Sequence, residues 1–306
     1  MLDLISVSVE FSSGGGVLAV DDVTLTIPDG DKLAILGETG SGKSVLLLAI
    51  LRLLPPSARA SGQVLLDGED LLCADPRRMR QVRGGLISYV PQGGGGSLNP
   101  LLTVGFQVGE PLIEHRGASK AAAIAASIGL LRRFHLVPAG ELAHAYPHTF
   151  SGGMRQRAMV AMGIAAGARI VLADEPTKGL DPRRVALVED AFGQLADETV
   201  VCVTHDLTFA ERVSRHICVM YAGRQIEYGP TAEVCARPLH PYTADLVRAL
   251  PENGMVYAGP DPEPTASAGC PYRTMCRDRF AACAESPPTF DVEGRKVRCW
   301  KYAPGH

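Results

Sequence analysis

A glycine-rich segment near the N-terminus has the residue types and spacing of a phosphate-binding loop. Residues 37–44 read GETGSGKS and fit the pattern G-x-x-x-x-G-K-[ST]. Glycines let the backbone curl so that successive N–H groups point at phosphate oxygens. In such a loop Lys43 reaches the β- and γ-phosphates, and Ser44 offers its hydroxyl to Mg²⁺. A glycine turn that matches by chance is disfavoured, because a buried strand (Lys32–Leu36) precedes the loop and an apolar helix (about Lys43 to Leu53) follows it.

Two adjacent carboxylates, Asp174 and Glu175, follow an apolar run (Ile170–Ala173) that is typical of a buried strand. Ligands of open α/β sheets bind at the carboxyl ends of strands, so we expect these acids to face the phosphate loop. Asp174 would then hold Mg²⁺ through water, and Glu175 would polarise an attacking water. A solvated strand end is the alternative, and the phosphate loop makes it the weaker one.

A third segment, Ser151–Arg157 (SGGMRQR), opens an amphipathic helix. Ser151 is a good N-cap residue, and the two glycines after it leave amides at the helix end uncovered. The segment therefore predicts a second anion-binding helix end. A capped helix with a flexible entry is the alternative. The sequence leaves open whether the two phosphate-binding ends meet within one chain or across two.

The surrounding elements alternate in a way that predicts an α/β fold. Strand patterns fill the first ninety residues, and a helical segment follows at about 103–166. Strand patterns return at Arg169–Ala173, Thr199–Thr204 and His216–Tyr221, alternating with helices, which predicts a mainly parallel sheet. Beyond about Cys235 the chain is rich in proline, glycine and cysteine. We expect a nucleotide-binding domain at 1–235 and a cysteine-bearing extension at 236–306.

Composition excludes several classes of protein. The 306 residues are 46% hydrophobic and carry a net charge of −3, which argues against a general nucleic-acid binder. The longest apolar stretch, Val45 to Leu54, is interrupted by Arg52 and is shorter than the roughly 20 residues of a membrane helix. The N-terminus lacks the basic start of a signal peptide. We therefore expect a cytosolic chain whose cysteines are thiols or metal ligands before disulfides.

Six motifs occur in the order and spacing of an ATP-binding cassette (ABC) ATPase. They resemble its Walker A, Q-loop, signature, Walker B, D-loop and H-loop motifs, at Gly37–Ser44, Gln92, Ser151–Gln156, Ile170–Glu175, Leu180-Asp181 and His205. The resemblance implies a P-loop NTPase fold: a RecA-like mixed sheet core with an N-terminal antiparallel β-subdomain, a helical signature subdomain and a small C-terminal extension. It also implies a head-to-tail dimer, in which Ser151 and Gly153 of one cassette close over ATP on the other.

The same resemblance assigns roles to single residues. Gln92 would sense Mg²⁺ and the attacking water, and His205 would contact the γ-phosphate and orient Glu175. Phe11 is the candidate for stacking on adenine by its spacing, with a core position as an equal alternative. The implied sets are catalytic Glu175, His205, Gln92 and Lys43; ATP-binding Phe11, Gly37, Glu38, Thr39, Gly40, Ser41, Gly42, Lys43, Ser44, Gln92, Ser151, Gly152, Gly153, Gln156, Asp181 and His205; and Mg²⁺-binding Ser44, Gln92 and Asp174.

Further segments resemble the peptide/nickel/opine importer ATPases, in particular those with a cysteine-bearing C-terminal extension. They are Ser97–Pro100, His240–Thr243, the Gly-Cys-Pro-Tyr from Gly269 and the Val-Arg-Cys-Trp that ends at Trp300. This resemblance implies two membrane permease subunits, a second ATPase subunit (a paralogue or the same chain), an extracytoplasmic solute-binding protein and a peripheral place at the cytoplasmic face of the inner membrane. Di- or oligopeptides are the expected cargo, with nickel or a metallophore, or a non-transport accessory role, as alternatives.

Four tail cysteines, Cys270, Cys276, Cys283 and Cys299, are separated by five, six and fifteen residues. Zinc sites usually have C-x₂₋₄-C pairs, and this spacing is wider. Four thiolates also suit an iron–sulfur cluster. Some members of the resembled subgroup carry a [4Fe–4S] cluster there, which favours that interpretation over unliganded thiols. By contrast, Cys202 and Cys218 lie on predicted buried strands and are expected to be core residues.

The sequence departs from the family in two places. Gly93–Gly96 stands where the family has an acid, proline and methionine, a segment that usually meets the permease, so the fit to the permease is in question. Lys178 replaces a small residue before Leu180-Asp181 and would mark a different substrate branch.

Three rival functions are weaker. A translation or DNA-repair ABC protein would carry two cassettes or a long coiled coil. A degenerate regulatory cassette would lack Glu175 or His205, and both are present. An accessory subunit of a phosphonate-processing complex would not co-purify with hydrophobic permeases.

Overall fold

The computed structural model describes residues 1–12, 16–92, 97–250 and 269–304. The chain forms two compact units, which we describe separately. The helical unit comprises Met1–Leu2, Ile27–Lys32 and Leu66–Thr204, and the sheet unit comprises Asp3–Thr26, Leu33–Leu65 and His205–His306. Among the described residues, no helix is long and apolar enough to cross a membrane.

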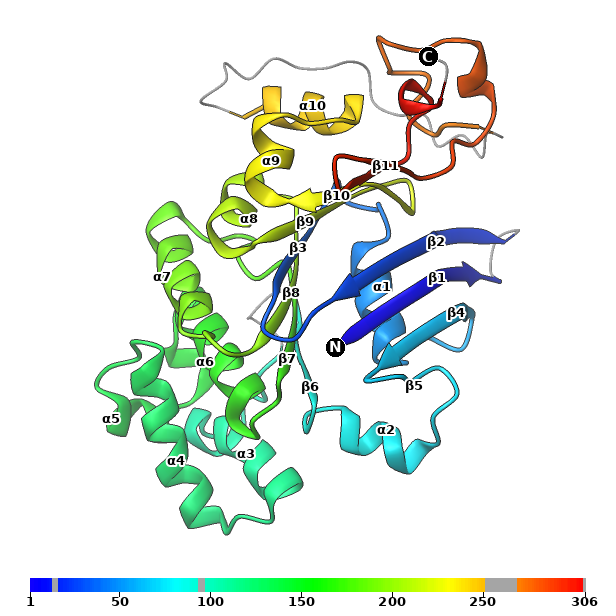
Figure 1. Ribbon diagram of the computed structural model, residues 1–306. Coiled ribbons are helices and arrows are strands. Elements are labelled where there is room, and N and C mark those ends of the chain that lie inside the picture. The colour runs from blue at the N-terminus through cyan, green and yellow to red at the C-terminus, as the bar shows by residue number, and fades with distance from the viewer. Residues whose placement is uncertain (13–15, 93–96, 251–268, 305–306) are drawn as a thin grey trace. The chain divides into compact units, whose positions relative to one another are not determined.

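The helical unit is built on a parallel sheet. Strand β7 pairs with β6 on one side and β8 on the other, with Val90 opposite Ala173 and Asp174 opposite Val203. Helices α3, α4, α5 and α6 gather into one bundle, drawn in green in Figure 1. The strands of the unit are β5 (Glu69–Asp70), β6 (Ile87–Val90), β7 (Ile170–Asp174) and β8 (Thr199–Thr204). Its helices are α2 (Pro76–Val82), α3 (Val104–Arg116), α4 (Lys120–Arg133), α5 (Ala139–His144), the short η1 (Pro147–Thr149), α6 (Gly152–Ala165) and α7 (Pro182–Gly193).

The sheet unit contains two sets of strands. In the first, β1 lies between β2 and β4, and Figure 1 draws β1 antiparallel to both. The second has the order β11-β12-β10-β9-β3, in which β3 and β9 are parallel and the other neighbours are antiparallel. Its strands are β1 (Leu2–Phe11), β2 (Val17–Ile27), β3 (Lys32–Leu36), β4 (Ala58–Leu66), β9 (His216–Tyr221), β10 (Arg224–Pro230), β11 (Phe290–Val292) and β12 (Arg295–Val297). Its helices are α1 (Lys43–Ile50), α8 (Leu207–Val213), α9 (Thr231–Ala236), α10 (Pro241–Arg248), η3 (Ala281–Ala284) and η4 (Trp300–Tyr302).

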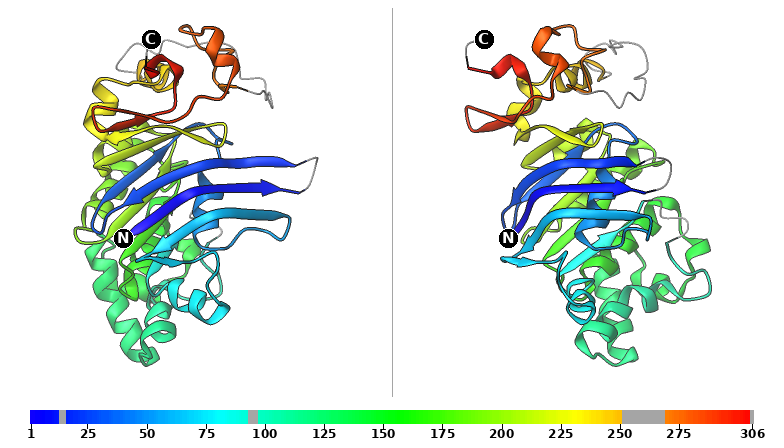
Figure 2. Two further views of the ribbon diagram at one scale, coloured as in Figure 1. Left: turned by 45° about the vertical axis from the view of Figure 1, so that its right-hand side comes forward. Right: turned by 90° about the vertical axis from the view of Figure 1, so that its right-hand side faces the viewer.

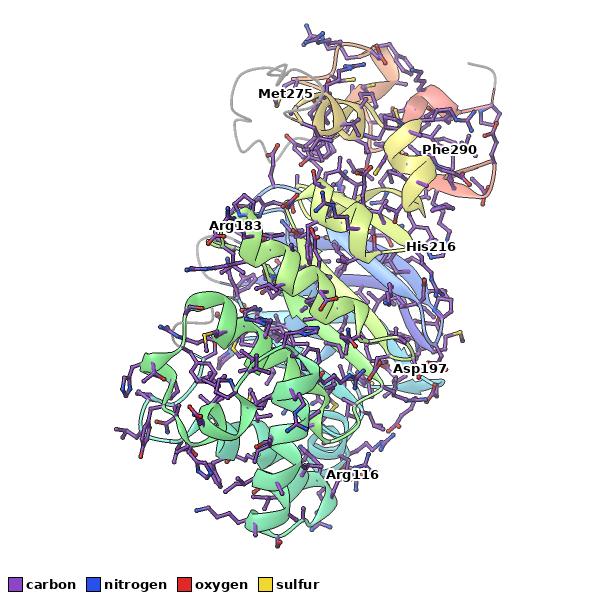
Figure 3. All side chains as sticks on the ribbon, turned by 90° about the vertical axis from the view of Figure 1, so that its left-hand side faces the viewer. Arg116, Arg183, Asp197, His216, Met275 and Phe290 are labelled. Carbon is purple, nitrogen blue, oxygen red and sulfur yellow. The ribbon has the colours of Figure 1, made fainter. Side chains whose placement is uncertain are left out.

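The cysteine-bearing segment shares its core with the sheet unit. Cys270 and Cys283 belong to the same buried cluster as Leu36 of β3 and Val219 of β9. Figure 2 shows this segment against β10 and its neighbours in both views, and Figure 3 labels Met275 and Phe290 within it. Packing on the sheet therefore contributes to the stability of this segment.

The predicted elements are confirmed with small shifts at their ends. The strands at Lys32–Leu36, Thr199–Thr204 and His216–Tyr221 have the predicted bounds, and the helical segment contains α3 to α6. The helix after the phosphate loop ends at Ile50, before the predicted Leu53. Arg52 takes a left-handed conformation (φ 51°), which closes the helix ahead of the two prolines at 55 and 56.

Candidate functional site

The phosphate loop joins β3 to α1 and passes very close to other backbone segments. A Cβ atom at Gly37 would lie 2.2 Å from the carbonyl oxygen of Met220, and one at Gly42 would lie 2.2 Å from that of Ala19. Gly42 also has a φ of 94°, which disfavours any residue with a side chain. These two positions therefore require glycine, both for the turn and for the fit of the loop.

The ammonium group of Lys43 is held inside this loop. The side chain is 5% exposed, and its Nζ donates to the carbonyl oxygens of Gly37 (2.6 Å) and Glu38 (2.7 Å) and to Ser41 Oγ (3.3 Å). A lysine ammonium has three donors, so the oxygens of the loop engage all of them. Ser44 is half-buried at the start of α1. The structure thus brings together a buried cation and a hydroxyl beside a curled backbone.

In the helical unit, Asp174 and Glu175 lie at the carboxyl end of β7, as predicted. Both are buried, at 4% and 7% exposed. Glu175 has a left-handed backbone (φ 47°), and its N–H donates to Val203 O at 2.9 Å, which fixes the residue against β8. A non-glycine residue in this conformation is strained by a small amount, which neighbouring contacts must offset. Such strain is concentrated at functional sites.

Tyr89 is a neighbour of these acids that sequence reasoning missed. Its hydroxyl donates to Asp174 Oδ2 at 3.2 Å. Burial, followed by the charge of Asp174, raises the pKa of Tyr89. The hydroxyl therefore stays protonated and acts as a donor that orients the carboxylate. The sequence places Tyr89 on a predicted strand, one residue before Val90, but this position alone does not reveal the hydrogen bond to Asp174.

The serine-glycine segment begins a capped helix. Ser151 caps α6, and its Oγ accepts the N–H of Met154 at 3.3 Å. Gln156 is 3% exposed, and its Nε2 has no hydrogen-bond partner within the described part of the chain. Asp181 caps α7 by accepting the N–H of Arg184 at 3.1 Å and pairs with that side chain at 3.0 Å. Arg183, labelled in Figure 3, lies on the first turn of this helix.

The remaining predicted site residues lie in both units. Gln92 is exposed beyond β6, and Gly152 starts α6 beside the buried Gly153. In the sheet unit, Phe11 ends β1 and is half-buried, His205 is exposed before α8, and the loop residues Glu38, Thr39 and Gly40 are exposed. The Gly93–Gly96 departure lies outside the described residues. Because the acids belong to one unit and the loop and His205 to the other, their meeting stays a prediction.

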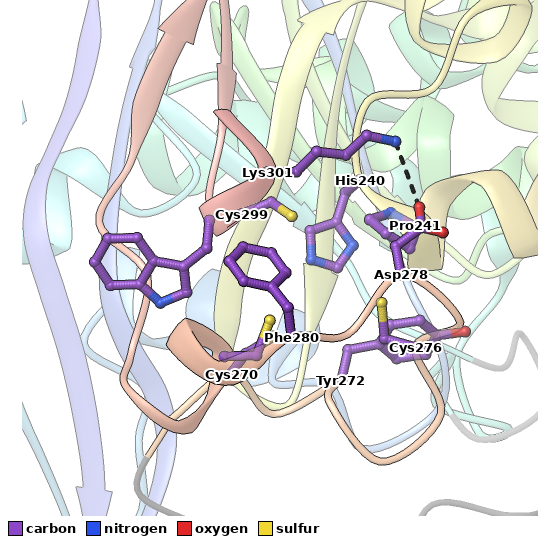
Figure 4. Close-up of a pocket in the computed structure, with 11 residues that line it drawn as sticks. His240, Pro241, Cys270, Tyr272, Cys276, Asp278, Phe280, Cys299 and Lys301 are labelled. Carbon is purple, nitrogen blue, oxygen red and sulfur yellow. Dashed lines mark hydrogen bonds and ion pairs between the residues drawn. The ribbon is translucent and has the colours of Figure 1, made fainter. Parts of the chain in front are cut away.

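The four tail cysteines line one pocket of the sheet unit, together with His240, Tyr272 and Phe280 (Figure 4). Cys270 and Cys283 are buried and Cys276 and Cys299 half-buried, and all four are free thiols. Burial is the main cause that raises the pKa values of Cys270, Cys276 and Cys299, and neighbouring thiols add to it. Within the described ranges, no three His, Cys, Asp or Glu side chains are placed to hold a single metal ion.

Comparison with known proteins gives the family. Residues 20–178 match the ABC transporter family, and residues 226–283 match the oligopeptide/dipeptide transporter C-terminal region. A putative peptide import ATP-binding protein of Brucella abortus is 38% identical over 98% of this chain and 94% of its own length. The dipeptide transport ATP-binding protein of Bacillus subtilis is 36% identical over the same shares of the two chains.

Solved structures agree with this result. The ATP-binding cassette MJ0796, in a dimeric post-hydrolysis state bound to ADP and Pi, matches with a TM-score of 0.68 and 30% identity, over 76% of this chain and 99% of that one. This likeness confirms the predicted P-loop NTPase fold with its cassette architecture. The chain belongs to the ATP-binding proteins of the ABC transporter family and carries the C-terminal region found in oligopeptide and dipeptide transporters.

Proposed function

We propose that this chain is the ATP-hydrolysing subunit of an ABC importer that takes up di- or oligopeptides. The observation that carries the proposal is the presence of both matched regions in one chain, the cassette and the oligopeptide/dipeptide C-terminal region. Two relatives matched over nearly their full length are named for peptide import and for dipeptide transport. We divide the chain into a nucleotide-binding domain at 1–235, with its helical part at about 103–166, and an extension at 236–306.

The phosphate loop binds the nucleotide in this proposal. Lys43 already lies inside the loop and would exchange its carbonyl contacts for β- and γ-phosphate oxygens, which is a stronger, charge-assisted pairing. The amides of Gly40 and Gly42 would point at phosphate, and the half-buried ring of Phe11 would stack on the adenine. Ser44, Gln92 and Asp174 would hold Mg²⁺, which neutralises charge on the phosphates.

Glu175 is the proposed general base of hydrolysis. It accepts a proton from water as the water oxygen attacks the γ-phosphorus, and the bond from that phosphorus to the β–γ bridging oxygen breaks to release ADP. Its burial and its backbone bond to Val203 support this role, because a base must be held in place. His205 would contact the γ-phosphate and orient Glu175, and Gln92 would report the state of the site.

The active assembly is proposed to be a head-to-tail pair of cassettes. Ser151, Gly152, Gly153 and Gln156 of one cassette, with Asp181, would close over ATP bound to the other. Gln156 Nε2, which has no hydrogen-bond partner among the described residues, and the capped start of α6 support a helix end suited to an anion. The other proposed partners are a second ATPase subunit, two membrane permeases and an extracytoplasmic solute-binding protein, with the chain peripheral at the cytoplasmic face of the membrane.

A [4Fe–4S] cluster in the cysteine pocket is a further part of the proposal. Four thiols line one pocket, and four cysteine thiolates are a donor set that suits an iron–sulfur cluster. Cys270, Cys276, Cys283 and Cys299 would bind as thiolates. Anaerobic purification tests this: a brown protein with about four irons and four sulfides per chain supports the cluster, and a colourless, iron-free protein removes it.

Uptake in whole cells tests the proposed cargo. Cells that carry the chain with its permeases and binding protein should accumulate a labelled dipeptide, and Glu175→Gln should reduce this to background while ATP binding remains. Labelled nickel serves as the comparison solute. If Glu175→Gln abolishes the uptake of nickel and leaves the uptake of the dipeptide unchanged, the peptide assignment is overturned.

A further inference from the structure

The side chain of Tyr242, from the C-terminal region, reaches the phosphate loop. The backbone N–H of Glu38 donates to the Tyr242 hydroxyl at 3.2 Å. On the other side of this residue, the Glu38 carbonyl accepts from Lys43 Nζ at 2.7 Å. Glu38 is therefore held by Tyr242 at its amide and by the loop lysine at its carbonyl.

Tyr242 is itself fixed by buried polar contacts. It is 2% exposed in the first turn of α10, where His240 Nδ1 accepts its N–H at 3.0 Å. The N–H groups of Leu239 and His240 both donate to the Glu227 carboxylate at 2.9 Å. Arg295 of β12 forms an ion pair with that carboxylate, and both side chains are fully buried. A tyrosine held in this way loses little additional freedom when it contacts the loop.

The rings around Tyr242 connect it to the cysteine pocket. The Tyr242 ring lies 4.6 Å from the Tyr221 ring and 5.4 Å from the Tyr272 ring, measured between centroids. Tyr272 lines the pocket of the four cysteines, as Figure 4 shows. Its hydroxyl donates to Asp245 and not to the loop. Tyr242 and Tyr272 thus share one cluster of rings and differ in what their hydroxyls bind.

We propose that Tyr242 is a positioning residue for the phosphate loop, through which the C-terminal region sets the affinity of this chain for nucleotide. The inference rests on the nucleotide site of the proposed function. The Tyr242 hydroxyl accepts the Glu38 N–H and so holds the backbone at the start of the loop in place before ATP arrives. Preorganisation of this kind strengthens binding because less ordering remains to be done when the ligand binds.

The test compares two variants that each remove one hydroxyl from the ring cluster. Tyr242→Phe should weaken binding of a fluorescent ATP analogue by about twofold to tenfold, the range expected from the loss of one hydrogen bond. Tyr272→Phe is the matched control and should bind as the wild type does. Equal affinity in wild type and Tyr242→Phe overturns the proposal, and so does an equal loss in Tyr272→Phe.

A second measurement separates positioning from a general loss of stability. In nucleotide-free protein, Tyr242→Phe should speed hydrogen exchange of the Glu38 amide, whereas Tyr272→Phe should leave it unchanged. In steady-state hydrolysis, KM for ATP should rise more than kcat falls, because the hydroxyl acts on binding. Slowed or unaltered exchange at Glu38 in Tyr242→Phe contradicts the proposal.

Lys43→Ala distinguishes this inference from the proposed function. If Lys43→Ala weakens nucleotide binding and Tyr242→Phe does not, the nucleotide site stands and the positioning role fails. If the wild type itself binds no nucleotide, both fail together.

Discussion

Replacing Arg295 by methionine tests how strongly the C-terminal segment is attached to the sheet unit. Arg295 and Glu227 are 1% and 0% exposed and form an ion pair across 68 positions of sequence. Removing only the arginine leaves a buried carboxylate with two backbone N–H donors and no cation. Loss of one partner of a buried pair typically costs about 3–5 kcal/mol.

The structure indicates that the loss of unfolding free energy in Arg295→Met lies near the lower end of the range of about 3–5 kcal/mol. Arg295 Nε is buried without a hydrogen-bond partner in the described part of the chain, so the wild type already carries one desolvated donor that methionine removes. We therefore expect Arg295→Met to lose about 3 kcal/mol of unfolding free energy. With a urea slope of about 3 kcal/mol per molar, the midpoint would fall by about 1 M.

Two further variants make the urea experiment decisive. Adding Glu227→Gln to Arg295→Met removes the stranded charge and keeps one carbonyl oxygen for the N–H groups, so the double variant should be about 1–2 kcal/mol more stable than Arg295→Met alone. The exposed pair Arg237 and Glu293, with side chains 65% and 64% exposed, is the control, and Arg237→Met should cost under about 1 kcal/mol. A double variant that unfolds more easily than Arg295→Met would refute the reasoning.

Three more changes follow from single contacts. Gly42→Ala should abolish binding of an ATP analogue, because the alanine Cβ would lie 2.2 Å from Ala19 O, and it should leave the circular dichroism spectrum unaltered. Retained affinity for the analogue would contradict this prediction. Glu175→Gln should bind ATP normally and lose most steady-state turnover. Burial lowers the pKa of His240 to about 3, below the value of about 6.5 in the unfolded chain. Because the unfolded chain then binds a proton more readily than the native state, the free energy of unfolding falls as pH drops below about 6.5. Between pH 7.5 and 5.5 the wild type should lose about 1 kcal/mol more than His240→Asn, which keeps a cap for Tyr242; equal losses would contradict this.

Short-range chemistry explains why most of the fold was predictable. The strands at Lys32–Leu36 and Thr199–Thr204 are apolar runs between turn residues, so their bounds follow from local pattern. Ser151 and Asp181 have the side chains that cap helices, and both form caps. Likewise, Cys202 and Cys218 are fully buried on β8 and β9, as a small apolar residue in a buried strand should be.

Contacts between distant segments explain what sequence reasoning missed. Tyr89 meets Asp174 across two strands that are 85 positions apart, and Tyr242 meets Glu38 across 204 positions. No spacing rule links such residues, because the register of the sheet and the path of the chain decide which side chains meet. The motif His240–Thr243 identified the C-terminal region in the sequence without revealing that its tyrosine contacts the phosphate loop.

The geometry of the phosphate loop depends on residues far outside the loop. Only glycine fits at position 37, because a Cβ atom there would lie 2.2 Å from the carbonyl oxygen of Met220 on β9. The N–H of Glu38 donates to the hydroxyl of Tyr242 on α10. Neither Met220 nor Tyr242 lies in the 20–178 segment that matches the cassette family. Tyr242 lies in the 226–283 segment that matches the transporter C-terminal region. The C-terminal region therefore contributes a contact to the phosphate loop, and the positioning role proposed for Tyr242 predicts that loss of this contact weakens nucleotide binding.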